Sequence, residues 1–83
     1  PKRRGLIRNA LVVLGNNLPE DGVERISRFA TRESDPMLRE HAFWALSGYK
    51  THEAAAALEK LLSAETDDTA REKMNAHMLH KHS

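Results

Sequence analysis

Apolar side chains recur at helical spacing in five separate stretches of the chain. In the first stretch they occupy positions 6, 7, 10, 11, 13 and 14, and the pattern stops at Gly15-Asn16, which predicts a helix over about 6–14. A second helix would bury the stripe formed by Val23, Ile26, Phe29 and Ala30. The other three stretches predict helices over about 36–47, 52–63 and 69–80.

Residues that favour helix starts stand before the later stretches. Pro19 suits the first turn of the second helix, because its missing N–H would have no intrahelical partner there. Asp and Thr side chains can accept hydrogen bonds from the free N–H groups of a first turn. The other start signals are Asp35-Pro36 for the third helix, Thr51 for the fourth and Asp67 or Asp68 for the fifth.

The third predicted helix is apolar on every side over residues 42–46. A helix of this kind is buried all round, so we expect it in the middle of the molecule. Its Trp44 could stack on a nucleic-acid base, but the apolar run around it favours a place in the core.

The sequence repeats with a constant offset and with no gap between copies. The offset equals the sequence separation between Asp35 and Asp67. At this offset, which we call the repeat period, residues 35–42 align with 67–74, and further aligned pairs are Ala10 with Ala42, Leu14 with Leu46 and Ile26 with Leu58. The period indicates helical hairpins that bury their apolar faces only against one another. The sequence therefore predicts an all-α fold, a right-handed α-solenoid of about two and a half hairpins and five helices. We place its repeats at about 6–31, 36–63 and 68–80 of one domain spanning 1–83.

The repeat also carries charge at fixed places. Asp35 and Arg39 stand four residues apart at a predicted helix start, and Asp67 and Arg71 repeat that pair. Stacked repeats would align these groups into a ladder between neighbouring copies. We interpret both arginines as structural and not as ligand-binding residues.

Composition narrows the range of functions. Eighty-three residues are enough for one small domain, and the absence of cysteine rules out disulfides and thiolate metal sites within it. No apolar run is long enough to cross a bilayer, and the start lacks a signal-peptide pattern, so we expect a cytoplasmic protein. Because the chain begins at Pro1 without methionine, we expect it to be a fragment of something larger.

Positive charge gathers at the start of the chain. Lys2, Arg3, Arg4 and Arg8 stand there with no acid among them, whereas the remaining residues carry 9 basic and 12 acidic side chains. A basic segment of this kind can contact phosphates or can be an ordinary terminus. We name these four residues as candidate nucleic-acid contacts, with Lys50 at the next turn between helices as a weaker one.

Two stretches of the sequence resemble a known family. Arg39-Glu40-His41-Ala42-Phe43-Trp44-Ala45-Leu46, preceded by Asp35-Pro36, resembles a HEAT-like repeat of the short bacterial type. The run Lys2-Arg3-Arg4-Gly5-Leu6-Ile7-Arg8-Asn9-Ala10, ending in Leu14-Gly15-Asn16, resembles the start of the C-terminal HEAT-like region of epoxyqueuosine reductases. The resemblance covers roughly residues 2–62, and the second run is its specific part.

The resemblance implies a role in tRNA modification. Epoxyqueuosine reductases complete queuosine in the tRNA anticodon loop, using cobalamin and 4Fe–4S clusters held in domains before the repeats. By resemblance, this chain would be an accessory domain that helps to hold tRNA and adjoins the catalytic domain of its parent protein. The cluster cysteines have no counterpart here, so the parent's chemistry must lie outside these residues.

No catalytic or metal site is expected within the chain. It has no Gly-rich phosphate loop, no nucleophile with a plausible base and no paired carboxylates on one face. His77, His80 and His82 lie near the end of the chain, where solvated side chains are more common than a metal site. The alternative function is a protein-interaction or interdomain scaffold that touches no RNA.

The first helix carries more apolar residues than one narrow stripe needs. Its additional apolar side chains belong to Leu6, Ile7, Val12 and Val13. At the end of a stack, this helix has a neighbour on one side only. We therefore expect some of the four to be exposed here and to be covered by the preceding domain of the intact protein.

Overall fold

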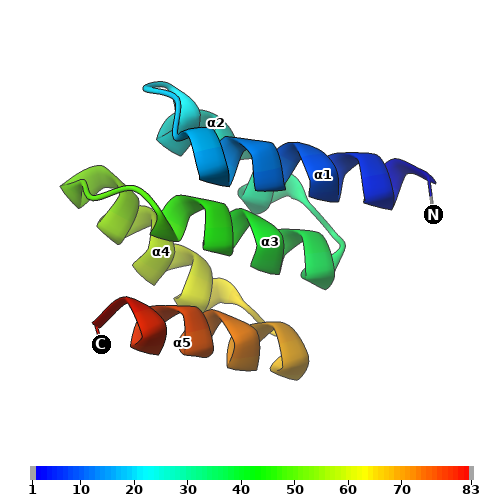
Figure 1. Cartoon of the computed structure of the whole chain (residues 1–83). Coiled ribbons are helices and arrows are strands. Elements are labelled where there is room, and N and C mark those ends of the chain that lie inside the picture. Colours follow the sequence, from blue (N-terminus) through cyan, green and yellow to red (C-terminus); the bar gives the residue numbers. More distant parts are fainter. Residues whose placement is uncertain (1, 83) are drawn as a thin grey trace.

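The computed structural model describes the backbone of residues 2–82 and the side chains of residues 2–79, and its described part is built from α helices (Figure 1). In chain order these are α1 (Lys2–Asn17), α2 (Gly22–Arg32), α3 (Pro36–Ser47), α4 (His52–Ala64) and α5 (Asp68–His82). The predicted all-α helical-repeat fold is confirmed.

The helices form two layers. α1, α3 and α5 lie side by side and run in the same direction, while α2 and α4 lie behind them and run back (Figure 1). α3 packs against all four other helices, so the prediction that it lies in the middle of the stack is confirmed. The molecule measures 33 × 29 × 21 Å.

Side-chain caps fix the starts of the last three helices. Asp35 accepts a hydrogen bond from the Met37 N–H at 3.0 Å, and Pro36 follows it in the first turn. Thr51 accepts one from the Ala54 N–H at 3.1 Å, and Asp67 accepts one from the Ala70 N–H at 2.9 Å. These side chains satisfy N–H groups that have no partner inside the helix, which is why the sequence located these starts well.

The bounds predicted for the first helix were too narrow. α1 begins at Lys2 because the straight side chains of Lys and Arg favour helix. It also runs through Gly15-Asn16 and ends at Asn17, where the Leu18 N–H bonds the Leu14 carbonyl at 2.8 Å and Leu18 takes a φ of 50°. Gly15 is therefore not a helix stop; it gives Trp44 of α3 room to approach α1.

The predicted position of Pro19 was wrong. α2 begins at Gly22, and Pro19 lies in the turn before it, where its carbonyl accepts hydrogen bonds from the Gly22 N–H at 3.0 Å and from Tyr49 Oη at 2.7 Å. Tyr49 follows α3, so a contact that is distant in sequence fixes this turn.

The core lies between the layers. Its fully buried large side chains are Ile26, Leu38, Phe43, Leu46 and Met74. Trp44, expected in the core, is only half-buried: it packs against the core from the side of α1. One side of α3 faces outward between its neighbours, which an apolar run in the sequence does not reveal.

Gly22 and Gly5 offer a matched pair of substitutions. A Cβ at residue 22 would overlap Tyr49 Oη, whereas one at residue 5 would have nothing within 4 Å. We expect Gly22→Ala to lower the free energy of unfolding by about 1–3 kcal/mol, because Tyr49 must move away from Pro19. Gly5→Ala should raise it by about 0.5–1 kcal/mol, because alanine favours helix. Urea denaturation of both variants checks this, and equal stability of the Gly22→Ala variant and the unsubstituted chain would contradict the close contact.

Candidate binding surface

The four basic residues predicted as phosphate contacts all lie on α1 and are exposed. Because α1 reaches back to Lys2, Arg4 and Arg8 share one face about a turn apart.

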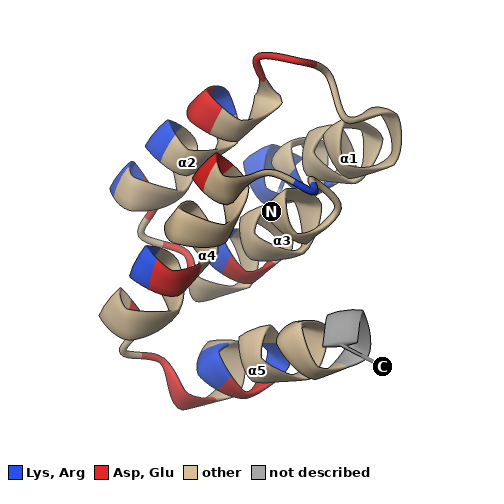
Figure 2. Cartoon of the chain, turned by 90° about the vertical axis from the view of Figure 1, so that its left-hand side faces the viewer, with Lys and Arg blue, Asp and Glu red and all other residues tan. Residues whose placement is uncertain are grey.

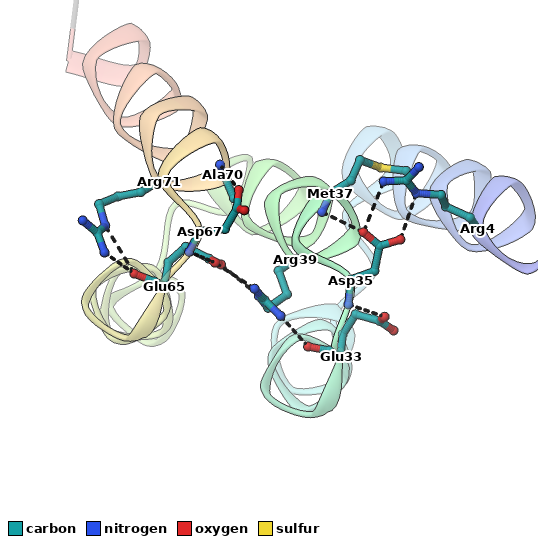
Figure 3. A network of polar contacts seen from close by, with 9 residues as sticks. All are labelled: Arg4, Glu33, Asp35, Met37, Arg39, Glu65, Asp67, Ala70 and Arg71. Atoms are coloured by element: carbon teal, nitrogen blue, oxygen red, sulfur yellow. Dashed lines mark hydrogen bonds and ion pairs between the residues drawn. The ribbon is translucent and has the colours of Figure 1, made fainter. Parts of the chain in front are cut away.

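Two of these residues are not free, although no acid stands among them in the sequence. Arg3 Nη2 lies 2.8 Å from Glu33 Oε1, and Arg4 Nε lies 2.8 Å from Asp35 Oδ2 (Figure 3 draws the second pair). Both acids belong to the segment between α2 and α3, about 30 residues away in sequence. The Arg3 and Arg4 side chains remain 65% and 53% exposed, so each guanidinium still presents donors to solvent.

The other three candidates divide into two places. Lys2 and Arg8 make no ion pair within the described part of the chain, so their charge on α1 is available. Lys50, also exposed, follows α3 near the C-terminal end of α1, where Gly48 lies close to the Gly15 carbonyl. Gly15 stands eleven residues after Arg4 on α1, or about 16 Å along the helix axis. The structure therefore does not bring Lys50 together with the basic residues of α1.

A second group of arginines extends the basic surface onto α2. Arg25, Arg28 and Arg32 are spaced i, i+3, i+7 and therefore lie along one side of that helix. Figure 2 shows basic positions in successive turns of α2. With Arg3, Phe29 and Glu33 they line a hollow of about 390 Å³ between the two helices. Arg25 pairs with Asp21 and Arg28 with Glu24, both in exposed i,i+4 pairs, whereas Arg32 has no ion pair among the described residues. The i, i+3, i+7 spacing of these arginines is visible in the sequence and could have indicated this surface.

We define the basic surface of the first hairpin as the arginines that line this hollow together with two further basic residues of α1. Its side chains are those of Arg3, Arg25, Arg28 and Arg32 and of Lys2 and Arg8. Residues 2–32 carry seven basic and three acidic side chains, whereas residues 33–83 carry six basic and nine acidic ones. The first hairpin is thus net positive by four and the rest net negative by three. A partner with phosphate groups would approach the molecule at this hairpin.

The predicted charge ladder exists, but with a different acid. Arg39 donates from Nε and Nη2 to the Glu65 carboxylate at 2.9 and 2.8 Å, and from Nη1 to the Glu33 carbonyl at 3.0 Å (Figure 3). Arg71 likewise donates to the Glu65 carbonyl at 2.6 and 3.2 Å. Asp35, expected beside Arg39, pairs with Arg4 instead.

The missed residues are Glu33 and Glu65, which the repeat period also aligns with each other. Each buried carboxylate accepts a hydrogen bond from the backbone N–H two residues later, at 2.9 Å to Asp35 and 3.0 Å to Asp67. The hydrogen bond from Arg39 holds the pKa of the Glu65 carboxyl below its ordinary value although burial opposes it, and Arg3 does the same for the pKa of Glu33.

α1 has no counterpart of Arg39, and Arg3 makes the corresponding contact in its place. The position of α1 that the repeat period aligns with Arg39 holds Ile7, which has no charge. Arg3 lies one turn earlier on α1 and reaches Glu33 instead. Arg3 therefore joins α1 to the next hairpin, in addition to any role toward a ligand.

Comparison with known families agrees with this repeated geometry. Residues 4–76 match the family model of HEAT repeats. The chain belongs to the HEAT repeat family. Neither the curated proteins nor the solved structures gave a match. HEAT repeats generally mediate protein interactions, which fits a stack of hairpins that offers its outer faces to partners.

The histidine near the end of the HEAT domain has a structural partner. His77, expected to be solvated, is half-buried: its Nε2 lies 2.6 Å from Oε2 of the buried Glu40, and its ring stacks on Phe43 at 6.3 Å between centroids. The side chains of His80 and His82 lie outside the described residues. Among the residues that are described, no three His, Cys, Asp or Glu side chains are arranged to hold a metal ion. The described helices also include none long and apolar enough to span a bilayer.

Arg39 and Arg25 differ in burial and allow a matched test of the ladder. Arg39→Ala should lower the free energy of unfolding by about 3 kcal/mol, because it leaves the buried Glu65 carboxylate without its cation. Arg25→Ala breaks only the exposed pair with Asp21 and should cost at most about 0.5 kcal/mol. Thermal and urea denaturation measure both, and similar losses in the two variants would argue against a structural ladder.

The ladder also predicts how stability depends on pH. The pKa values of Glu33 and Glu65 are lower in the folded chain than in the unfolded one. The two carboxylates therefore contribute fully to the free energy of unfolding above the unfolded-state pKa of about 4.3. This contribution is lost as the pH falls through their lower folded-state pKa. We expect Glu65→Gln to flatten the decline of the unfolding free energy between about pH 5 and 3. Glu24→Gln, in an exposed pair, should keep the original decline, and the same flattening in both variants would contradict this assignment.

Proposed function

We propose that this HEAT domain is an accessory tRNA-binding module of a larger enzyme that resembles the epoxyqueuosine reductases. The observation that carries the proposal is the concentration of positive charge on the first hairpin, where a hollow is lined by four arginines. The resemblance of residues 2–16 to the C-terminal region of those enzymes supplies the kind of RNA.

The basic surface suits a phosphate backbone. Arg8 and Arg32 are exposed and have no ion pair among the described residues, and Arg3, which lines the hollow with Arg32, keeps most of its side chain exposed. Contacts from such residues position a nucleic acid without reading its sequence. The domain would therefore hold tRNA in place while another domain recognises the base to be modified.

The parent's chemistry would lie outside this chain. By resemblance, the preceding catalytic domain would hold cobalamin and 4Fe–4S clusters, and the HEAT domain would adjoin it in a cytoplasmic enzyme. With no cysteine in its sequence, the HEAT domain itself cannot ligate such a cluster through thiolates.

The second candidate function is a protein-interaction scaffold without RNA contact. The ion pairs of Arg3 and Arg4 favour it, because they give two of the basic residues a structural reason to be present. Membership in the HEAT repeat family favours it as well.

A tRNA-binding measurement separates the two functions. The domain should bind tRNA weakly, with a Kd of roughly 10⁻⁴–10⁻⁶ M. Arg8→Ala combined with Arg32→Ala removes two unpaired cations, so the slope of log affinity against log salt should fall by about 2 units without loss of helicity. Lys60→Ala combined with Lys73→Ala makes the same charge change on α4 and α5 and should leave binding nearly unchanged. Equal effects of both double variants, or no tRNA binding at all, would place the scaffold function first.

A further inference from the structure

One face of α1 is apolar and uncovered. Leu6 and Val13 are 61% and 55% exposed, and Ala10 between them is exposed as well. Leu6, Ala10 and Val13 are spaced i, i+4, i+7, so they form one stripe along the helix. We call these three residues the outer stripe of α1.

The repeat shows what this stripe corresponds to. The repeat period aligns its three residues with Leu38, Ala42 and Ala45 of α3, and all three of these are completely buried. Ala45 lies against Gly15 of α1, on the side of α3 that faces the preceding hairpin. The outer stripe therefore occupies the positions with which a helix of this fold packs against its predecessor.

The other end of the stack is built differently. Phe43 of α3 stacks on α5, but the position of α5 that the repeat period aligns with Phe43 holds Asn75, which is exposed. Asp68 and Glu72 stand at the neighbouring positions of α5 and are exposed too. The outward face of α5 is thus mostly polar and can remain in water, whereas that of α1 is apolar and continues the pattern of a buried interface.

Charge at the start of α1 restricts what can cover the stripe. Between α1 and α3, arginines of the preceding helix meet Glu33 and Asp35 just before the following helix. At α1 the sign is reversed: the position that the repeat period aligns with Asp35 holds Arg3, beside Lys2. A helix packed on α1 must therefore bring acids to this end, where repeats of this chain bring arginines.

A second copy of this chain fits the outer stripe poorly. Stacked head to tail, it would place α5 on α1 and bring both Asp68 and Arg71 toward Lys2 and Arg3, so charge does not decide against it. It would, however, set Asn75 and Glu72, which are exposed, against the apolar stripe. Burial of these polar side chains without hydrogen-bond partners opposes this arrangement.

We infer that the outer stripe is the docking site for an amphipathic helix of the preceding domain of the parent protein, parallel to α1 and with acidic residues in its first turns. Such a helix would cover Leu6, Ala10 and Val13 as α1 covers α3, and its acids would face Lys2 and Arg3. This inference rests on the proposal that the HEAT domain is part of a larger enzyme, but it does not depend on tRNA binding.

A fusion tests the inference on the domain itself. A designed 16-residue helix, as long as α1, is joined to residue 1 through a flexible Gly/Ser linker of about 16 residues, enough to return along the roughly 24 Å of the helix. One version has a leucine stripe and glutamates in its first two turns, and the other has lysines in place of those glutamates. A tethered helix acts at millimolar effective concentration, so a weak contact becomes measurable.

We expect the acidic version to raise the urea midpoint of unfolding by about 0.5–1 M and the basic version to leave it unchanged. Leu6→Gln combined with Val13→Gln should abolish the gain, and because both side chains are exposed the unfused double variant should retain its helicity. Leu79→Gln is the matched control, since Leu79 is 73% exposed on α5, and it should keep the full gain.

Four results would overturn the inference. They are the absence of a gain with the acidic helix, an equal gain with the basic helix, a gain that survives Leu6→Gln and Val13→Gln, and dimerisation of the unfused domain that these substitutions abolish. The last would show that a second copy occupies the stripe. All four are distinguishable from failure of the proposed function, because the tRNA measurement uses Arg8 and Arg32, which lie outside the outer stripe.

Discussion

The stack depends on a buried carboxylate that joins two hairpins. Glu65 follows α4, yet its side chain is held by Arg39 of α3 and its carbonyl by Arg71 of α5. A carboxylate without these partners would be costly to bury, so the three helices must keep their relative positions for Glu65 to remain satisfied. Apolar packing supplies most of the stability, whereas this network determines how one hairpin sits on the next.

The sequence predicted the parts of the fold that depend on local signals. The starts of α3, α4 and α5 follow from Asp35, Thr51 and Asp67, whose side chains bond N–H groups two or three residues away. The error at Pro19 has the opposite origin, because Tyr49 fixes the turn there from about 30 residues away. Trp44 packs against the core, as expected, but stays half-buried beside Gly15 of α1.

The candidate site was predicted less well because charge at a terminus was considered without the loops that come to lie beside it. Arg3 and Arg4 find their acids after α2, and Arg32, which no motif singled out, joins the basic surface because it lines the same hollow as Arg3. Pairs of this kind bring together positions about 30 residues apart. They can be predicted from the sequence only if the repeat period is used to align acidic as well as apolar residues.

The two outer helices, α1 and α5, each depart from the repeat pattern, and these departures make the outward faces of the two helices different. Arg3 stands where the next repeat has the acid Asp35. It keeps α1 attached to Glu33, and it also places positive charge beside the outer stripe. On α5, Asn75 stands where α3 has Phe43, and it makes the outward face of α5 more polar. A repeat protein needs such polar positions where it ends and apolar ones where it continues. The chemistry of the two outer helices therefore favours the first hairpin for both the proposed RNA contact and the proposed helix-docking surface.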